Sequence, residues 1–369
     1  MKNKVKINKS NKSKFILSLL ILGLLLSIVS PLKDKLQELV GFKEKDLKVL
    51  ASIELNGWED IKAKSYKDKV VVVEEAINCY DYKNKKLWTQ ALKEQDEVYL
   101  GKSSVFVNNK EKNTIRRLDL DGLDLWSYNT ERPVYTFIEI EDYLFIYSKV
   151  DESTRSVTIL DKNGKLVLDK QKSKEEILSA NVSKNKRNFV ITSMDTSSPE
   201  LISKITYLRH DGETIWTEEV KDKIIYNILF LDNKNMLLIG DKEIICKNDK
   251  GETLWERQMK YTLKDIEVTE DNEIYTLYGN EDSYLEILKE DGELDYSKTF
   301  KKEYKDIEEL EGHILLMGKS GILGLNDRKI SMRSDFKGEV SRIEKSEHEI
   351  LSFQPNKLDI FEIIDKEEK

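Results

Sequence analysis

The stretch RHDGETIWTEEV, residues 209–220, places a tryptophan four residues after an Asp-Gly pair. The chain has only five tryptophans, yet NDKGETLWERQM, residues 248–259, repeats a closely similar arrangement. Asp-Gly and Asn-Gly pairs supply the residue with positive φ that a tight hairpin needs, and glycine does so without a Cβ clash. The aromatic residue then lies on the outgoing strand. The two stretches therefore predict a repeated β-hairpin.

Seven copies of this hairpin follow one another along the chain. Their turn positions are separated by 38, 42, 48, 39, 41 and 37 residues, and they are Asn84, Gly122, Gly164, Gly212, Gly251, Gly292 and Lys329. A period near 40 residues with several short strands per unit is typical of a β-propeller. We expect the aromatic residues to pack between adjacent blades rather than bind a ligand; they are Trp88, Trp126, Trp216, Trp255 and Tyr296. The fold class is predicted to be all-β.

The two ends of the repeat region complement each other. The unit from residue 263 reads as four strands, but the copy that starts at Glu339 has only three before the chain stops. Residues 46–55 form an unassigned strand of suitable length. If this strand pairs with the carboxyl-terminal blade, the ring closes and no strand edge is left open. This predicts an eight-bladed propeller over residues 46–366, with a seven-bladed ring as the alternative.

The amino terminus has the pattern of a membrane anchor. Residues 1–14 carry six lysines and no acidic residue, and FILSLLILGLLLSIVS, residues 15–30, is uncharged. The positive-inside rule places the basic tail in the cytoplasm and the rest outside. We expect a cytoplasmic tail at 1–14, a transmembrane helix at 15–31 and a linker at 32–45. A cleaved signal peptide is the alternative, although Ile28 and Pro31 would flank its cut poorly.

The charge of the remaining chain argues against nucleic-acid binding. The net charge of the whole chain is −8, so residues 31–369 carry −14 once the six lysines are set aside. Phosphate contacts need clustered lysine and arginine. The sequence predicts a membrane partner and a protein partner, and no nucleic acid.

Cysteines and candidate metal ligands give no constellation that would support chemistry. Cys79 and Cys246 fall on the third strands of units on opposite sides of the predicted ring, so we expect two buried free thiols. Asp119, Asp121 and Gly122 match part of a calcium loop, but its first and last ligand positions fail. The three histidines, His210, His313 and His348, lie in different units. We predict no metal, no cofactor and no catalytic residue.

The repeat resembles that of quinoprotein-like, pyrroloquinoline-quinone-type propellers. The shared pattern is an apolar strand, an Asp before the turn, a Gly and a Trp, as in Asp119, Gly122 and Trp126 or Asp81 and Trp88. In that family the tryptophans form a docking layer around the ring. The enzymes of the family bind the quinone with calcium and usually have an adjacent-cysteine disulfide, but this chain has no Cys-Cys pair. The layout of anchor and propeller also resembles uncharacterised membrane-anchored propellers of Gram-positive bacteria.

Three functions are therefore compatible with the sequence. We expect a non-catalytic propeller, anchored in the cell membrane and exposed on its extracytoplasmic side, that acts as a protein-binding scaffold or sensor. A carbohydrate or cell-wall binding module is the alternative, and a quinone-dependent oxidoreductase is less favoured. Recognition is expected on the loops between blades and on the longest insertion, residues 193–204, because loops on a rigid scaffold commonly carry binding.

Overall fold

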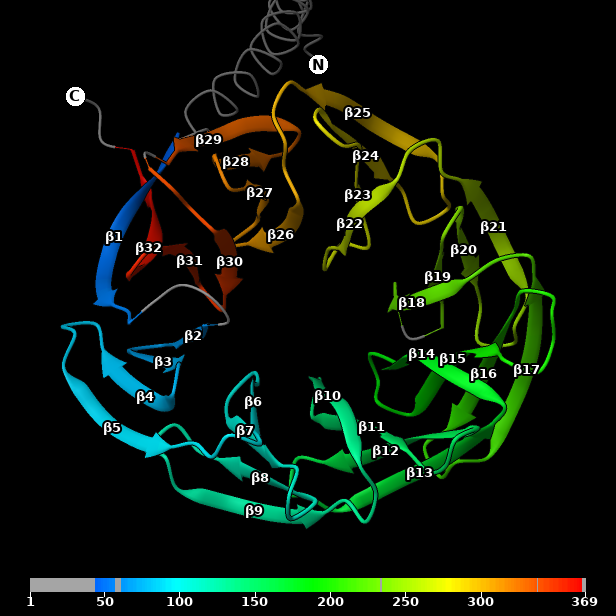
Figure 1. The fold of residues 1–369 in the computed structure, drawn as a ribbon. Helices are drawn as coiled ribbons and strands as arrows, with labels where there is room; N and C mark the ends of the chain where they lie inside the picture. Colours follow the sequence, from blue (N-terminus) through cyan, green and yellow to red (C-terminus); the bar gives the residue numbers. More distant parts are fainter. Residues whose placement is uncertain (1–43, 57–60, 233, 337, 367–369) are drawn as a thin grey trace, which may run out of the picture.

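The fold is an all-β propeller-like ring. The computed structural model describes residues 44–56, 61–232, 234–336 and 338–366, which contain strands and turns but no helix. The strands form small antiparallel sheets around a common axis, as Figure 1 shows. The predicted transmembrane helix at 15–31 and most of the predicted linker lie outside the described residues. Within the described ranges, no helix has the length and apolarity that a membrane crossing needs.

Six sheets each contain four consecutive strands, ordered from the axis outward (Figure 1). The first three comprise β2 Lys62–Tyr66, β3 Lys69–Val73, β4 Ala76–Asp81, β5 Lys86–Ala91; β6 Asp96–Leu100, β7 Val105–Asn109, β8 Thr114–Leu118, β9 Asp124–Asn129; and β10 Val134–Ile140, β11 Tyr143–Lys149, β12 Thr154–Asp161, β13 Leu166–Ser173. The next three comprise β14 Glu175–Val182, β15 Asn188–Asp195, β16 Ile202–Arg209, β17 Thr214–Lys221; β18 Ile225–Phe230, β19 Met236–Gly240, β20 Glu243–Lys247, β21 Thr253–Gln258; and β22 Leu263–Val268, β23 Ile274–Tyr278, β24 Ser283–Leu288, β25 Leu294–Phe300.

The remaining strands form one eight-stranded sheet in the order β26-β27-β28-β29-β1-β32-β31-β30. Its two four-stranded halves meet where β29 and β1 pair in parallel at Met332 and Lys45. The strand bounds are β26 Asp306–Leu310, β27 His313–Gly318, β28 Gly321–Asn326, β29 Lys329–Asp335, β1 Lys45–Glu54, β30 Arg342–Ser346, β31 Glu349–Gln354 and β32 Lys357–Asp365.

The first described strand lies beside the last. β1 pairs antiparallel with β32, from Lys45 opposite Asp365 to Glu54 opposite Lys357. Ion pairs join Lys45 to Asp365 at 2.8 Å and Lys48 to Glu362 at 2.7 Å. Further along β1, Ala51 and Ile53 are buried with apolar residues of β31, β32 and β3. Apolar burial therefore holds the amino-terminal strand as the outer strand of the carboxyl-terminal sheet.

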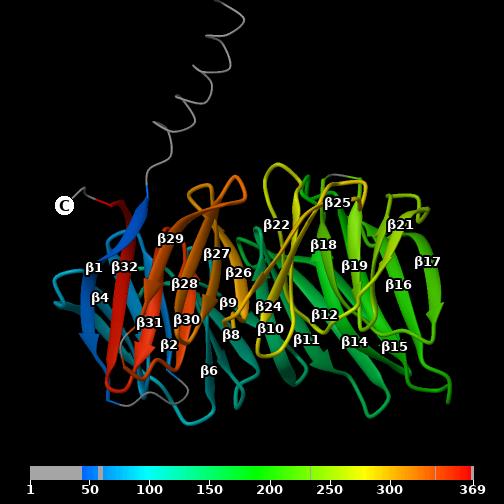
Figure 2. The ribbon, with the colours of Figure 1, turned by 90° about the horizontal axis from the view of Figure 1, so that it is seen from above.

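Strand direction gives the ring two distinct faces. Within each sheet, the first-to-second and third-to-fourth strand turns lie on one face, because neighbouring strands are antiparallel. β1 begins and β32 ends on this face, which we call the entry face (Figure 2). The second-to-third strand turns and the crossovers between sheets lie on the opposite face, which we call the far face. The chain before residue 44 therefore joins the ring at the entry face.

The repeated hairpin turns are three-residue loops closed by a bulge. In the second sheet, Gly122 N–H donates to Asp119 O at 3.1 Å, and Asp119 Oδ1 accepts from the amides of Asp121 and Leu123, each at 2.9 Å. The register then shifts by one residue between Arg117 and Leu118. A type I turn followed by a residue with positive φ gives this geometry. The aspartate of the repeat therefore organises the turn.

In the seventh copy the predicted turn position is wrong by one or two residues. Asp327 and Arg328 have the positive φ values, 44° and 64°, whereas Lys329 begins β29. The turn of this copy has no glycine, and two consecutive residues with positive φ close its hairpin instead. A turn assigned by counting from the other copies misses this change of turn type.

Each outer-strand aromatic residue contacts the turn of the following sheet. The indole Nε1 atoms of Trp88, Trp126, Trp216 and Trp255 donate to the backbone carbonyls of Leu120, Lys162, Asp249 and Glu290 at 2.9–3.0 Å. Their rings lie against the turn glycines Gly122, Gly164, Gly251 and Gly292, and Leu168 takes the same place against Gly212. Tyr296 reaches the next turn through its hydroxyl, 3.4 Å from Arg328 O.

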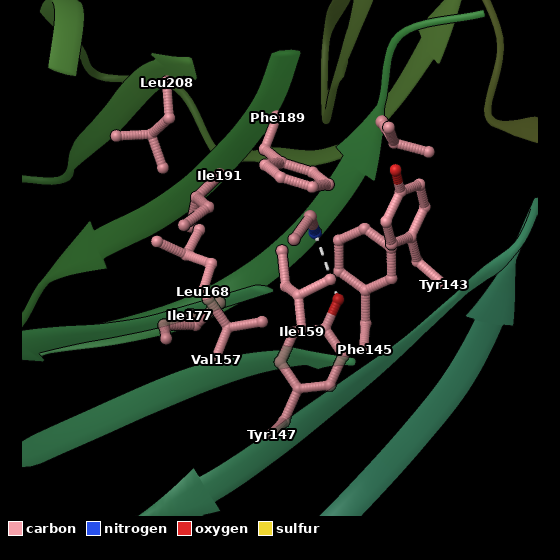
Figure 3. Close-up of a cluster of buried hydrophobic side chains, with 12 residues drawn as sticks. Tyr143, Phe145, Tyr147, Val157, Ile159, Leu168, Ile177, Phe189, Ile191 and Leu208 are labelled. Carbon is pink, nitrogen blue, oxygen red and sulfur yellow. Dashed lines mark hydrogen bonds between the residues drawn. The ribbon is translucent and has the colours of Figure 1, made fainter. Parts of the chain in front are cut away.

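The core consists of separate clusters at the seams between sheets. In the cluster of Figure 3, Tyr143, Phe145 and Tyr147 of β11 pack with Ile177, Phe189 and Ile191 of the next sheet. The amide of Ala180 donates to the Tyr147 hydroxyl across this seam at 3.1 Å. Each sheet thus buries its apolar faces only against its neighbours, which is the packing principle of repeat architectures.

Replacing Gly292 with alanine should destabilise the ring by at least about 2 kcal/mol. The residue has a φ of +81°, and an added Cβ would lie 2.6 Å from Trp255 Cδ2. Gly312→Ala is the matched control: its φ is +73°, but nothing lies within 4 Å of the added Cβ, so it should cost only about 1 kcal/mol. Urea unfolding of both variants measures the difference. Equal losses would mean that the indole contact contributes nothing beyond the backbone strain.

Replacing Trp216 with alanine should lower the free energy of unfolding by about 3 kcal/mol. The indole stacks on the buried Tyr207 ring at 5.4 Å and donates to Asp249 O, so truncation removes apolar contact and leaves that carbonyl without its donor. Ile215→Ala, at a side chain that is 45% exposed, should cost less than about 1 kcal/mol. Chemical denaturation of the two variants gives the comparison, and similar losses would contradict the docking role.

Candidate functional site

The residues predicted from the repeat lie together on the outer rim of the ring. The four tryptophans and Tyr296 are on outer strands, and the five turn glycines are on the entry face. Their side chains and backbones contact one another from sheet to sheet, as described above. A different set of residues lines a hollow on the far face.

Two adjoining pockets open on the far face between the sheet of β18–β21 and the sheet of β22–β25. Their volumes are about 290 and 600 Å³, and both include residues 258–261 at the end of β21 and the start of the crossover to β22. We call this hollow the tyrosine groove; its residues are Asp241, Lys242, Glu256, Arg257, Gln258, Met259, Lys260, Tyr261, Thr262, Tyr278, Gly279, Asn280, Tyr284 and Glu286.

Three tyrosines form one wall of the groove. Tyr261 is 55% exposed, and its ring meets the ring of Tyr284 edge-on at 5.6 Å. The ring of Tyr284 lies 6.4 Å from that of Tyr278, which is buried at the end of β23. The Tyr284 hydroxyl donates to Glu286 Oε1 at 3.3 Å, which orients the ring. Exposed aromatic surface with fixed orientation suits the stacking of an apolar or planar group.

Fixed ion pairs line the other side of the groove. Arg257 Nη2 lies 2.8 Å from Glu286 Oε2, and Glu286 is buried, so this pair is held between the two sheets. Gln258 donates to the buried Glu243, whose other partner is Lys223. Because these charged groups pair with one another, Met259, Lys260 and Tyr261 are the side chains of the groove that are more available to a ligand. A concave wall with a few polar groups is typical of a recognition site.

A second cluster lies on the innermost strands of the ring. β22 carries Asp265 and Glu267, and the neighbouring β26 carries Asp306 and Glu308. Burial raises the pKa of Glu267 to about 7, and the nearby Glu308 carboxylate adds to this shift. Burial also raises the pKa of Asp265 to about 6, although the Ile307 amide, which donates to its Oδ2 atom at 2.8 Å, acts against the rise.

With its pKa raised to about 7, the Glu267 carboxyl group can hold a proton close to neutral pH, as general acid–base catalysis requires. Lys345 Nζ on β30 lies 3.1 Å from Glu308 Oε2. Across the described part of the chain, no three His, Cys, Asp or Glu side chains are arranged to hold a metal ion. The absence of cofactor and catalytic chemistry stays a prediction.

The cysteines and histidines are dispersed. Cys79 on β4 and Cys246 on β20 are buried and unpaired on the third strands of their sheets, as predicted. His313 contacts Ser331 Oγ at 3.0 Å, and His210 contacts the Tyr143 hydroxyl at 3.2 Å. His348 is exposed in the turn between β30 and β31. The structure does not bring the three histidines together.

Half of the longest predicted insertion is strand. Residues 193–195 end β15, residues 202–204 begin β16, and only 196–201 form the turn between them. This sheet has strands of eight residues, so the extra length extends its hairpin on the far face. The tyrosine groove does not include this insertion. It combines Tyr261, Tyr278 and Tyr284 from three different elements, and no local sequence motif marks that combination.

Residues 42–364 match the model of a family described as a family of unknown function, DUF5711. The chain belongs to this family. No curated protein matches the sequence. The family model spans almost the whole ring, and its description gives no activity. The resemblance to quinone-type propellers stays a prediction.

Solved structures similar to this chain are propeller-like and distant in sequence. BamB from Moraxella catarrhalis is 13% identical, with 86% of this chain and 100% of that chain covered and a TM-score of 0.59. The Dos1 propeller is 8% identical, with coverage of 86% and 95% and a TM-score of 0.58. Sqt1 from Saccharomyces cerevisiae is 5% identical, with coverage of 88% and 97% and a TM-score of 0.57. At these identities the likeness shows the fold alone.

Replacing Glu267 with glutamine should make the ring more stable above neutral pH. The raised pKa means that the folded state favours the protonated acid, so this group's contribution is present at acid pH and is lost as the pH rises through about 7. Glu267→Gln should therefore gain about 1 to 2 kcal/mol over the wild type at pH 8 and little at pH 4.5. Urea unfolding across this pH range checks the expectation.

Glu111→Gln, in the exposed hairpin between β7 and β8, is the control and should keep the wild-type pH profile. A Glu267→Gln variant whose stability follows the wild type from pH 4.5 to pH 8 would refute the raised pKa of Glu267.

Proposed function

We propose that this chain is a non-catalytic propeller that binds a protein partner through the tyrosine groove. The observation that carries this proposal is the placement of the groove. It opens on the far face, whereas the chain before residue 44 joins the ring at the entry face. When the chain is attached at the entry face, the groove on the far face is left open to a partner, as a scaffold or sensor requires.

The groove also has the composition of a protein-binding surface. Tyrosine, methionine and arginine are enriched at the centres of protein interfaces, and all three line this groove. The buried pair of Arg257 and Glu286 fixes the two sheets on either side, so the shape of the groove is formed before a partner arrives. A preformed surface loses little conformational entropy on binding.

The anchor and location form part of the same proposal. Residues 15–31 would cross the cell membrane with the basic tail of residues 1–14 inside, so the ring would lie on the extracytoplasmic side. The groove would then face away from the membrane. The support for this is the sequence pattern of lysines followed by an uncharged apolar run.

We also infer that the ring has eight blades. Six four-stranded sheets and the two halves of the eight-stranded sheet support this count, with β1 as the outer strand of the last blade. In a seven-bladed ring, strands β30–β32 and β1 would have no place as a blade of their own.

Carbohydrate binding is the second candidate, because the exposed ring of Tyr261 is also suited to stacking on a sugar. In the protein-binding proposal, the partner is a polypeptide and the same ring packs against its side chains. The two candidates differ in what a reactive group at residue 261 would capture.

A photo-crosslinking amino acid at position 261 of the full chain in native membranes should capture a protein. The same group at Leu123, which is 65% exposed beside an entry-face turn, is the positional control and should give only background. Gel mobility and mass spectrometry of the adducts measure the outcome. Tyr284→Ala should reduce the capture at 261 at least several-fold, because it removes the edge-on partner of the Tyr261 ring.

Three results would count against protein binding through the groove. The first is capture of wall polymer at 261 in place of protein, which would support the carbohydrate candidate. The second is equal capture from positions 261 and 123. The third is no adduct from 261 in cells that hold normal amounts of the protein.

A further inference from the structure

Four neighbouring sheets share an irregularity on their innermost strands. The pairing register of β10, β14, β18 and β22 with the next strand shifts by one residue near the strand start. The unpaired residues are Tyr135, Leu178, Tyr226 and Lys264. The innermost pairs β2–β3, β6–β7, β26–β27 and β30–β31 have no such shift. The bulges are therefore confined to one continuous arc of the ring.

A β-bulge redirects a side chain and breaks the ladder locally, and bulges concentrate next to functional sites. All four bulges lie where the innermost strand begins, which is its far-face end. Three of them hold apolar or aromatic side chains in consecutive sheets. We call Tyr135, Leu178 and Tyr226 the bulge arc.

The bulge arc leaves apolar surface in contact with solvent. Tyr135 and Tyr226 are each 42% exposed, although both lie on innermost strands, and Leu178 is partly exposed between them. The Tyr135 ring lies 6.2 Å from that of Tyr147, whose hydroxyl accepts the Ala180 amide of the next sheet. Figure 3 shows Tyr147 at this seam, with its hydrogen bond drawn as a dashed line.

Lys264 ends the arc at the fourth bulge. Its Nζ atom donates to Asn280 O at 2.8 Å and to Tyr304 O at 3.1 Å, so the ammonium group is held by backbone carbonyls on both sides of a seam. The apolar part of the arc therefore spans the three sheets of β10–β13, β14–β17 and β18–β21. It adjoins the tyrosine groove, since Asp241 lines the groove and its Oδ1 atom accepts from the Ile224 amide at 3.0 Å, two residues before Tyr226.

The far-face turns outside the arc carry negative charge. The second-to-third strand turns of these sheets and of the next one cover residues 150–153, 196–201, 241–242 and 279–282. They contain six acidic residues and one lysine; the acidic residues are Asp151, Glu152, Glu200, Asp241, Glu281 and Asp282. Of the cations in the adjacent crossovers, Arg132 pairs with Asp169 at 3.0 Å and Lys223 pairs with Glu243, whereas Lys174 and Lys260 are exposed.

We propose that the bulge arc and these acidic turns form a docking surface for a lysine- or arginine-rich segment of a partner protein that also carries apolar side chains. The proposal rests on the proposed protein-binding function and adds the residues and the chemistry of the partner. Apolar side chains of the segment pack on Tyr135, Leu178 and Tyr226, while its cations lie near the acidic turns. Charge complementarity of this kind contributes to specificity and to the rate of association.

Binding of three synthetic peptides to the detergent-solubilised full chain tests this proposal. The first is a fluorescent twelve-residue peptide of Lys, Leu and Ser; the second has Glu for every Lys; the third has Ser for every Leu. The first should bind, and the other two should bind at least ten-fold more weakly. Its affinity should fall several-fold between 50 and 300 mM salt, because exposed charges are screened.

Variants of the ring locate the surface. Tyr135→Ser with Tyr226→Ser should weaken the basic peptide at least ten-fold, and Glu152→Gln with Glu281→Gln should weaken it two- to five-fold and reduce the salt dependence. The control is Leu87→Ser on β5 with Leu123→Ser just before β9, both next to the entry face; Leu87 has the same 42% exposure as the two tyrosines. This control should bind like the wild type. Thermal unfolding of each variant verifies that the ring is intact.

Equal binding of the basic and acidic peptides would overturn the proposal, and so would wild-type binding by the folded double tyrosine variant. The photo-crosslinking experiment at residue 261 keeps this failure separate from that of the proposed function. If position 261 captures a protein while the peptides do not discriminate, the partner chemistry proposed here is wrong and the protein-binding function stands. If the bound segment of the captured protein is then mapped and is acidic, the same conclusion follows.

Discussion

The contact between an outer-strand indole and the turn of the next sheet is the interaction on which the ring depends. A four-stranded sheet of this size has two apolar faces and cannot bury either of them alone. The indole covers the outer end of the seam, and its N–H donates to the one turn carbonyl that points toward it. Glycine in the turn lets the ring and the backbone approach. The apolar clusters at the seams extend from this contact toward the axis.

The repeat was predictable because its signal is local. An aspartate, a glycine and a tryptophan within eight residues define a turn and an outgoing strand, so the sequence alone predicts most of the hairpins. The prediction failed at Lys329, since the seventh hairpin uses two non-glycine residues with positive φ. A motif that counts from glycine cannot detect a turn closed by a different pair of residues.

The candidate surfaces were not predictable in the same way. Tyr261, Tyr278 and Tyr284 come together only because two sheets pack side by side, and their spacing in the chain follows no period. The bulges left a weaker trace. Val134-Tyr135, Ile177-Leu178 and Ile225-Tyr226 are doubled apolar pairs that interrupt the alternation of a strand, and this interruption indicates one extra residue. An assignment that records only a strand for each segment does not detect the extra residue.

The junction at Lys45 and Met332 has a mechanical consequence. A pull on the chain before Glu44 acts along β1, whose partners on both sides are themselves folded into sheets. Because the hydrogen bonds to β32 run across the strand from residue 45 to residue 54, such a force loads them together in shear instead of opening them one at a time. The strand that completes the ring is thus also placed to resist tension on the chain.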